Sequence, residues 1–240
     1  MNLYDKHIEI LQGLEPVFGF NPANVQQGSP DWHVMRLGCL SASNADKIVA
    51  KRDSEGRQSY MASLIDQVIS CEVDDSPSFK QTEFGKLWEP VAREALSAQL
   101  GFAIIKELPF MYMDGRMRVG VSPDGVFDNT IAEIKCPYDG ANFAKFAAFE
   151  GMKKSWRWQC QFQLFATGAE RHIMAQYNPR IKLCDNLYFS ETLRNDADFA
   201  TLSDAVPQFI EDFDAALDKL GVEWGSHWRY LKDNRNQVTE

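Results

Sequence analysis

The chain has 240 residues, of which 45% are hydrophobic and 25% are charged. This composition is typical of a soluble globular protein and excludes a disordered chain. No apolar run is long enough to span a bilayer, and residues 1–14 mix charged with apolar side chains, unlike a signal peptide. We therefore expect a cytoplasmic protein without a membrane partner.

The five cysteines and four histidines are dispersed along the chain, and no C-x-x-C pair occurs. This spacing excludes a disulfide framework and a zinc site of the usual kind, so a bound metal is expected to have oxygen ligands. The net charge of −9 argues against a nucleic-acid partner. It does not decide the question, because binding depends on the charge of one groove rather than on the average over the surface.

The first third of the chain is expected to be helical. Ser43 and Asp46 have the spacing of a capping box, which predicts a short helix that ends at Ala50. Pro90 lies inside a later helix and is expected to kink it beside Glu89. The predicted helices of this part cover residues 43–50, 59–72 and 81–100.

Two of these helices have apolar residues at helical spacing, which predicts the faces that pack on the core. In the helix over 59–72 the apolar residues are Met61, Leu64, Ile65, Val68 and Ile69. In the helix over 81–100 they are Phe84, Leu87, Trp88, Val91 and Ala95.

From residue 102 onward the pattern changes to strands alternating with helices. The predicted strands cover residues 102–113, 117–121, 131–136, 171–177 and 186–193, and the predicted helices cover residues 142–149, 155–167 and 196–220. No repeat or linker interrupts the chain, so we predict a single domain over 1–240 whose polar tail, residues 229–240, is loosely held. The element order predicts an α/β fold in which a central mixed β-sheet is flanked by helices.

The most informative segment places Asp124 in a turn and Glu133 and Lys135 on the strand that follows. Side chains alternate along a strand, so Glu133 and Lys135 point to one face while Ala132 and Ile134 point to the other. A turn or hairpin can bring Asp124 beside them. Two carboxylates and one ammonium group would then lie at one surface of the sheet.

Phosphodiester hydrolysis requires such a set of groups. Two carboxylates can hold Mg²⁺, which polarises the phosphoryl oxygen and lowers the pKa of a bound water. Lys135 would orient that water or stabilise the charge of the transition state. A plainer interpretation also exists, because Ser122-Pro123-Asp124-Gly125 is a favourable turn sequence and two charges on a strand often form a solvated face.

The combination of these residues resembles the PD-(D/E)XK nuclease superfamily and, within it, the phage lambda exonuclease or alkaline exonuclease family. The likeness covers residues 31–225 in order, which makes this segment the expected core. Its motifs are Trp32-His33-x-x-Arg36-Leu37-Gly38, Ser41-Ala42-Ser43, Gly85-Lys86-x-x-Glu89, Ser122-Pro123-Asp124-Gly125, Glu133-x-Lys135-Cys136-Pro137, Gln159-x-Gln161, Tyr177-Asn178-Pro179-Arg180 and Val206-Pro207-Gln208-Phe209-Ile210-Glu211.

The resemblance implies a restriction-endonuclease-like core and a role for each matching residue. Asp124 and Glu133 match metal ligands and Lys135 matches the catalytic lysine. The other matching residues are Glu89 and Gln159 at the catalytic site, with Gln161 as a neighbouring candidate, and Arg36, Ser43 and Ser122 as phosphate contacts. Arg52 is a further candidate phosphate contact. Several have structural alternatives: a surface salt bridge for Arg36, a helix cap for Ser43, and a solvated stripe for Gln159, Gln161 and Gln163.

Two departures from the family concern the DNA end. The basic stretch at Lys51 and Arg52 is diluted by acidic residues, so Arg52 and Arg57 are both candidates for phosphate binding. Where the family has an apolar wedge that separates the two DNA strands, this chain has the polar residues Gln81, Thr82 and Glu83. Phe84 would serve as the wedge only if the register differed.

The family implies a Mg²⁺-dependent 5′→3′ exonuclease, with Mn²⁺ as a substitute, that degrades one strand of duplex DNA and leaves a 3′ overhang. It also implies a ring-shaped homotrimer on DNA ends, a single-strand annealing protein as partner, and a phage or prophage origin with action in the bacterial host. Three alternatives remain at this stage: a site-specific or structure-specific endonuclease with the same metal core, a catalytically inactive DNA-end-binding recombination scaffold, and a structural α/β domain.

Overall fold

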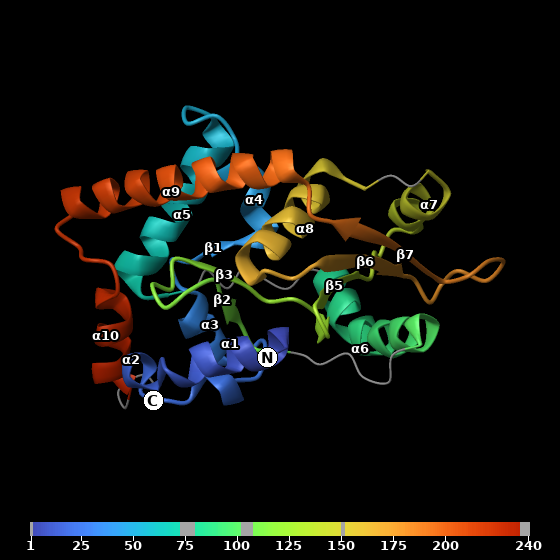
Figure 1. Cartoon of the computed structure of the whole chain (residues 1–240), viewed down its shortest axis with the longest axis horizontal. Helices are drawn as coiled ribbons and strands as arrows, with labels where there is room; N and C mark the ends of the chain where they lie inside the picture. The colour runs from blue at the N-terminus through green and yellow to red at the C-terminus, as the bar shows by residue number, and fades with distance from the viewer. Residues whose placement is uncertain (1, 73–79, 102–107, 150–151, 236–240) are drawn as a thin grey trace.

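A computed structural model describes residues 2–72, 80–101, 108–149 and 152–235 of the chain. The strands of this part of the chain form one three-stranded and one four-stranded sheet. Helices pack around the sheets (Figure 1). The predicted mixed α/β class is confirmed. The expected single central sheet is instead divided in two, and residues 102–107 of the strand predicted over 102–113 lie outside the described residues.

The four-stranded sheet has the order β4-β5-β6-β7. Its strands are β4 (Gly125–Phe127), β5 (Thr130–Lys135), β6 (Arg171–Tyr177) and β7 (Leu187–Leu193). Strands β5 and β6 are parallel, and the other two pairs are antiparallel. The parallel connection is a crossover through α7 (Gly140–Phe149) and α8 (Lys154–Thr167), as parallel pairing requires.

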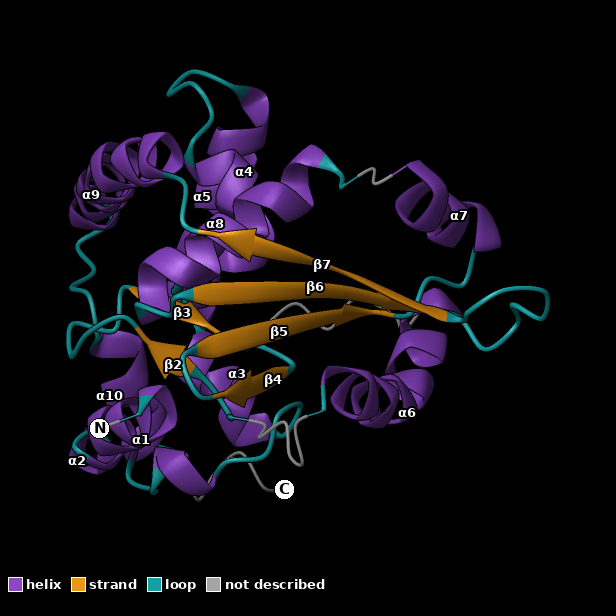
Figure 2. Cartoon of the chain, turned by 45° about the vertical axis from the view of Figure 1, so that its right-hand side comes forward, coloured by secondary structure: helices purple, strands orange, loops and turns teal. Residues whose placement is uncertain are grey.

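Helices cover both faces of this sheet (Figure 2). Helix α6 (Lys80–Leu100) packs Ala92 and Leu96 against Ala132 and Ile134 of β5. Helices α7 and α8 contact the sheet from the opposite side. Burial on both faces explains why β5 is almost continuously buried, including Glu133 at 5% exposure.

The three-stranded sheet has the order β1-β3-β2 and consists of very short strands. They are β1 (Leu40–Ser41), β2 (Met111–Tyr112) and β3 (Val119–Val121). Gly120 lies so close to the Phe110 ring that a Cβ atom there would overlap it. Close approach of ring and backbone therefore accounts for the glycine in β3.

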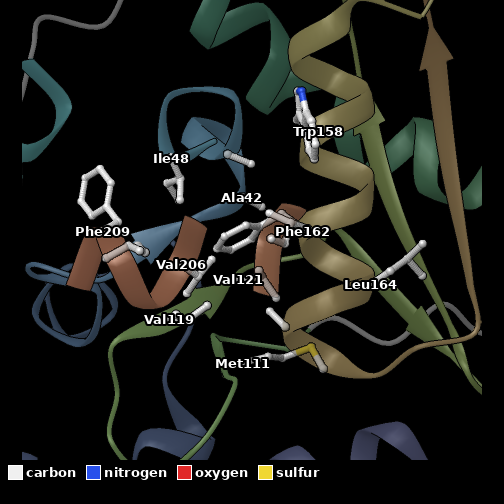
Figure 3. Close-up of a cluster of buried hydrophobic side chains, with 14 of the residues drawn as sticks. Ala42, Ile48, Met111, Val119, Val121, Trp158, Phe162, Leu164, Val206 and Phe209 are labelled. Carbon is white, nitrogen blue, oxygen red and sulfur yellow. The ribbon is translucent and has the colours of Figure 1, made fainter. Parts of the chain in front are cut away.

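Helix α8 is the centre of the largest apolar core, which joins the two sheets to the surrounding helices. Figure 3 shows Trp158 and Phe162 of α8 with Val119 and Val121 of β3 and with Phe209, which lies on the long helix α9 (Asp196–Lys219). The helices on this side are α4 (Ala45–Ile48), α5 (Glu55–Ser70) and α9. Asn195 caps α9 by accepting a hydrogen bond from the Asp198 amide.

The first and the last helices of the described chain contribute to a second core. Its elements are α1 (Leu3–Gln12), α2 (Glu15–Phe18), the 3₁₀ turn η1 (Pro22–Asn24), α3 (Pro30–Arg36) and α10 (Ser226–Asp233). Trp228 of α10 is 1% exposed and packs edge-on against Phe18. The prediction of a loose tail over 229–240 is therefore wrong for the residues up to Asp233, because the preceding tryptophan fixes this helix to the domain.

Several local predictions also need correction. Ser43 does not cap a helix: it lies in the 3₁₀ turn η2 (Ala42–Asn44), and α4 begins at Ala45 with Asn44 before it. Helix α5 begins at Glu55, earlier than expected, and its Ile69 is 51% exposed.

The apolar face predicted for α6 is confirmed at Trp88 and Ala95, which pack against the core of the four-stranded sheet, and is wrong at Leu87 and Val91. Leu87 is 67% exposed and Val91 41%, while Ala92 and Leu96 contact the sheet. The smaller alanine allows the helix to approach the strands closely. Within the described residues, no helix is long and apolar enough to cross a bilayer.

Candidate active site

Asp124 is positioned by the hairpin of β4 and β5. Its backbone amide donates to the Ala132 carbonyl at 3.0 Å, one residue beyond the Gly125–Ala132 pair. The Ile134 amide donates to Asp124 Oδ2 at 2.6 Å. The hairpin therefore brings the Asp124 carboxylate to the strand that carries Glu133 and Lys135, as the sequence predicts.

Glu133 and Lys135 form an ion pair with 2.5 Å between Lys135 Nζ and Glu133 Oε1. Burial alone would raise the pKa of Glu133, but the Lys135 ammonium and the hydrogen bonds from Lys135 and Gln163 lower it. Burial alone would lower the pKa of Lys135, but Glu133 and Asp124 raise it. Both groups are therefore charged at neutral pH.

The pKa of Asp124 shifts in the direction that disfavours its charged form, unlike those of Glu133 and Lys135. Burial, followed by the negative charges of Glu133 and Glu89, raises its pKa well above the ordinary value. Glu89 belongs to α6 and accepts a hydrogen bond from Arg93 at 2.5 Å. Three carboxylates thus lie near one lysine, and an added cation would stabilise the ionised form of Asp124.

The donor set fits a hard divalent cation. Among the residues that the structure describes, no three His, Cys, Asp or Glu side chains come close enough to enclose a metal ion. Mg²⁺ does not need such a cage, because it keeps several waters and binds through one or two carboxylates. Asp124 and Glu133 supply these oxygen donors, and every carboxylate oxygen that accepts one hydrogen bond retains a second lone pair.

The glutamines of α8 are buried rather than solvated. Gln159 is 7% exposed, Gln161 2% and Gln163 1%. The Gln161 amide donates to the Leu193 carbonyl and accepts from the Asn195 amide, so this residue joins α8 to the end of β7. Gln163 donates to Glu133 Oε2 at 2.7 Å. The solvated-stripe interpretation is therefore wrong for all three residues.

Gln163 is a site residue that the sequence did not single out. Only its position four residues after Gln159 on the same helix face hinted at a shared environment. The helical period could not indicate which glutamine would reach Glu133.

Arg36 and Ser122 meet at Trp32 of α3. The Arg36 guanidinium lies 3.9 Å from the centre of the Trp32 ring. The Trp32 indole donates to Ser122 Oγ at 3.1 Å, and the Ser122 hydroxyl donates to the Pro109 carbonyl at 2.8 Å. In the described part of the chain Arg36 forms no salt bridge, so the salt-bridge interpretation is not supported.

Arg36 and Ser43 line the same hollow, which has a volume of about 480 Å³. Lys47 and several further hydroxyl side chains line it as well. The hollow therefore combines positive charge with neutral hydrogen-bond donors, which is a composition suited to a phosphate group. Ser122 is not among its lining residues.

Arg52 lies elsewhere, against α9. Arg52 and Arg57 both contact the Asp212 carboxylate, and Arg57 Nη2 is 2.8 Å from Asp212 Oδ2. Arg52 is 71% exposed at its side chain, whereas Arg57 is 5% exposed. The acidic partner of both arginines is thus Asp212, which is far away in the sequence, and not one of the acidic residues adjacent to Arg52 in the sequence.

Phe84 is half-buried within an aromatic cluster on α6. Its ring centroid lies 5.4 Å from that of Tyr138, and Arg180 lies over both rings at 4.7 and 4.1 Å. This packing places Arg180, from the motif that follows β6, beside the start of α6.

Comparison with known proteins supports the resemblance. The model of the YqaJ-like viral recombinase domain matches residues 31–170. The ExoD protein of Escherichia coli (strain K12) is 32% identical over 85 residues, which are 35% of this chain and 97% of ExoD.

Solved structures show the fold. The alkaline exonuclease LHK-Exo from Laribacter hongkongensis has a TM-score of 0.70 and 24% identity, over 88% of this chain and all of LHK-Exo. Its complex with dAMP gives a TM-score of 0.71 at the same identity and coverage. A phage-related exonuclease from Haemophilus somnus 129PT has a TM-score of 0.63 and 14% identity, over 76% of this chain and 96% of that one.

These matches confirm the restriction-endonuclease-like core and the resemblance to the alkaline exonucleases. The family match includes the Asp124, Glu133 and Lys135 site and the Arg36 hollow. The two solved proteins named above, which share its fold, are described as exonucleases, and the chain itself belongs to the YqaJ-like viral recombinase domain family.

Proposed function

We propose that this protein is a Mg²⁺-dependent deoxyribonuclease, for which Mn²⁺ can substitute. The observation that carries the proposal is the convergence of Asp124, Glu133 and Lys135 at one hairpin. Asp124 and Glu133 would hold the cation, whose chemistry is Lewis-acid polarisation of the phosphate and of a bound water. The electrostatics support this assignment, because the carboxylates crowd each other in the absence of a cation.

The protein groups contribute charge and position. Lys135 is an ammonium at neutral pH, so it can donate to a phosphate oxygen and stabilise the negative charge that develops on it. Glu89 and Gln159 are the proposed neighbours of the reacting phosphate, from α6 and α8 respectively.

The hollow around Arg36 and Ser43 is the proposed site for a DNA phosphate. Arg36 is stacked on Trp32 and presents a preorganised guanidinium, which favours binding of a phosphate. Ser122 and Arg52 are proposed as further phosphate contacts. For Arg52 this requires that its exposed guanidinium exchange Asp212 for a phosphate.

The proposed reaction is 5′→3′ exonucleolytic degradation of one strand of linear duplex DNA, which leaves a 3′ overhang for strand annealing. The exonuclease fold and the viral recombinase family support it. A homotrimeric ring around DNA ends and a single-strand annealing protein as partner belong to the same proposal, as do a phage or prophage origin and action in the bacterial cytoplasm. Light scattering tests the ring: a monomer at working concentration would contradict it.

The experiment uses linear duplex DNA labelled at one 5′ end or one 3′ end, with and without Mg²⁺, and covalently closed circular duplex in parallel. Metal-dependent loss of the 5′ label from linear DNA, with the opposite strand intact, is the expected result. Cleavage of the closed circle would instead identify an endonuclease. Binding without any cleavage would identify a DNA-end-binding scaffold.

A further inference from the structure

Beneath α8, the Glu133 carboxylate oxygen that is not bonded to Lys135 is held by Gln163. Gln163 Nε2 donates to Glu133 Oε2 at 2.7 Å, and Gln163 Oε1 lies 2.6 Å from His172 Nε2. Glu133 and His172 lie on adjacent parallel strands, β5 and β6, and Gln163 reaches both from the helix above them. The four side chains form one continuous chain of contacts, Lys135–Glu133–Gln163–His172.

The hydrogen-bond chemistry fixes the orientation of each group. An ionised Glu133 only accepts, so the Gln163 amide must present its NH₂ to the carboxylate and its oxygen to His172. His172 must then donate from Nε2, which leaves Nδ1 as the unprotonated ring nitrogen. In the described residues His172 Nδ1 has no hydrogen-bond partner.

Burial keeps this arrangement in a single state. Gln163 is 1% exposed and His172 is fully buried. Burial also lowers the pKa of His172 to about 4, so the imidazole is neutral at physiological pH and serves as a fixed donor. A buried amide that turned over would face the carboxylate with its oxygen, which is strongly unfavourable.

We propose that Gln163 and His172 are a positioning pair that fixes the Glu133 carboxylate for metal binding. The inference rests on the proposed function in one respect, namely that Glu133 is a metal ligand. Gln163 restrains Oε2 of Glu133 while Lys135 holds Oε1, so the carboxylate is kept in one orientation. Outer groups that orient a ligand in this way typically change metal affinity about 10–100-fold when removed.

The test compares Gln163→Leu with Gln161→Leu. Both glutamines are buried on α8, but the amide nitrogen and the amide oxygen of Gln161 bond to the backbone at and just after the end of β7. Gln161, a neighbouring candidate in the sequence analysis, is therefore directed away from Glu133 and can serve as the control. Mn²⁺ binding to the full chain without DNA is measured by electron paramagnetic resonance, after folding is checked by circular dichroism. We expect at least tenfold weaker Mn²⁺ binding for Gln163→Leu and unchanged binding for Gln161→Leu.

His172 provides a second, independent perturbation. His172→Phe removes the donor to Gln163 and is expected to weaken Mn²⁺ binding, whereas His172→Gln retains a donor and is expected to restore most of it. If Gln163→Leu does not fold, these two variants decide the question. Wild-type affinity in His172→Phe, or in a folded Gln163→Leu, would overturn the inference, as would equal losses in Gln163→Leu and Gln161→Leu.

DNA hydrolysis is measured separately, so that failure of the positioning pair can be distinguished from failure of the proposed nuclease function. Metal-dependent hydrolysis by the wild type with unchanged Mn²⁺ affinity in the variants would refute only the positioning pair. Mn²⁺ binding that depends on Glu133 and Gln163, without hydrolysis, would refute only the nuclease. A wild type that binds no Mn²⁺ would refute the pair. In Gln163→Leu, hydrolysis is expected to recover as Mn²⁺ is raised, which a folding defect would not do.

Discussion

Asp212 is expected to be a major determinant of stability because it neutralises a buried arginine. Arg57 is only 5% exposed at its side chain and lies 2.8 Å from Asp212, with its guanidinium 4.7 Å from the centre of the Phe209 ring. Asp212→Ala would leave Arg57 buried without an acidic partner among the residues that the structure describes. Breaking a buried pair in this way costs about 3–5 kcal/mol.

The exposed partner of the same carboxylate is expected to matter far less. Arg52 is 71% exposed, and pairs at that exposure contribute at most about 1 kcal/mol. In a domain of this size each 1 kcal/mol shifts Tm by about 2–4 °C. We therefore expect Asp212→Ala to lower Tm by about 6–20 °C and Arg52→Ala to lower it by less than about 4 °C.

Thermal unfolding followed by circular dichroism measures both shifts, and the double variant Arg57→Met/Asp212→Leu is the control. Removing both charges together is expected to recover much of the stability that Asp212→Ala loses. Equal, small shifts for Asp212→Ala and Arg52→Ala would refute the reasoning. A large loss of DNA affinity in Arg52→Ala at nearly unchanged Tm would assign Arg52 to DNA.

Three further predictions concern packing, pH and phosphate binding. Gly120→Ala is expected to cost about 1–3 kcal/mol in urea unfolding because its methyl group would overlap the Phe110 ring, whereas Gly56→Ala, in open space on α5, is expected to stabilise by about 0.5 kcal/mol. Burial lowers the pKa of His227 to about 4 in the folded protein. As the pH falls, this histidine is therefore protonated in the unfolded chain before it is protonated in the folded one. Stability should be retained above pH 6.5 and fall by up to about 3 kcal/mol toward pH 4, and His227→Phe should remove that part of the pH dependence; an unchanged pH profile would contradict the buried neutral ring. Arg36→Ala is expected to weaken binding of 5′-phosphorylated duplex DNA about tenfold, because a charged hydrogen bond is lost. Fluorescence anisotropy measures the binding, with a 5′-hydroxyl duplex as the control, and an equal effect on both duplexes would place Arg36 away from the terminal phosphate.

The arrangement of charged side chains on β5 was predictable because it is local. Glu133 and Lys135 are two residues apart, so the strand period alone places them on one face, and their ion pair confirms it. Asp124 was predictable in part. Its approach to Glu133 depends on β4, which has only three residues and too short a pattern to recognise.

The parts that sequence reasoning missed depend on tertiary packing. Helical spacing on α6 favours the large apolar side chains, yet Leu87 is exposed and Ala92 contacts the sheet because a small residue permits close approach. Helix α10 has a polar surface, and it is held to the domain by Trp228, which is buried in the second core with Phe18 and Tyr112.

Gln163 and His172 illustrate the same limit at the site. They are nine residues apart, on different elements, and neither has a motif of its own. Their contact depends on how α8 crosses β5 and β6, which no local pattern encodes.

We propose above all that Asp124, Glu133 and Lys135 together hydrolyse DNA phosphodiesters. The most direct measurement is the single-turnover rate of Mg²⁺-dependent cleavage of linear duplex DNA by the wild type, Asp124→Ala and Lys135→Ala, with folding verified by circular dichroism. We predict metal-dependent cleavage by the wild type and a loss of at least about 100-fold in each folded variant, as expected when a group that stabilises transition-state charge is removed. Wild-type rates in either folded variant would contradict the account.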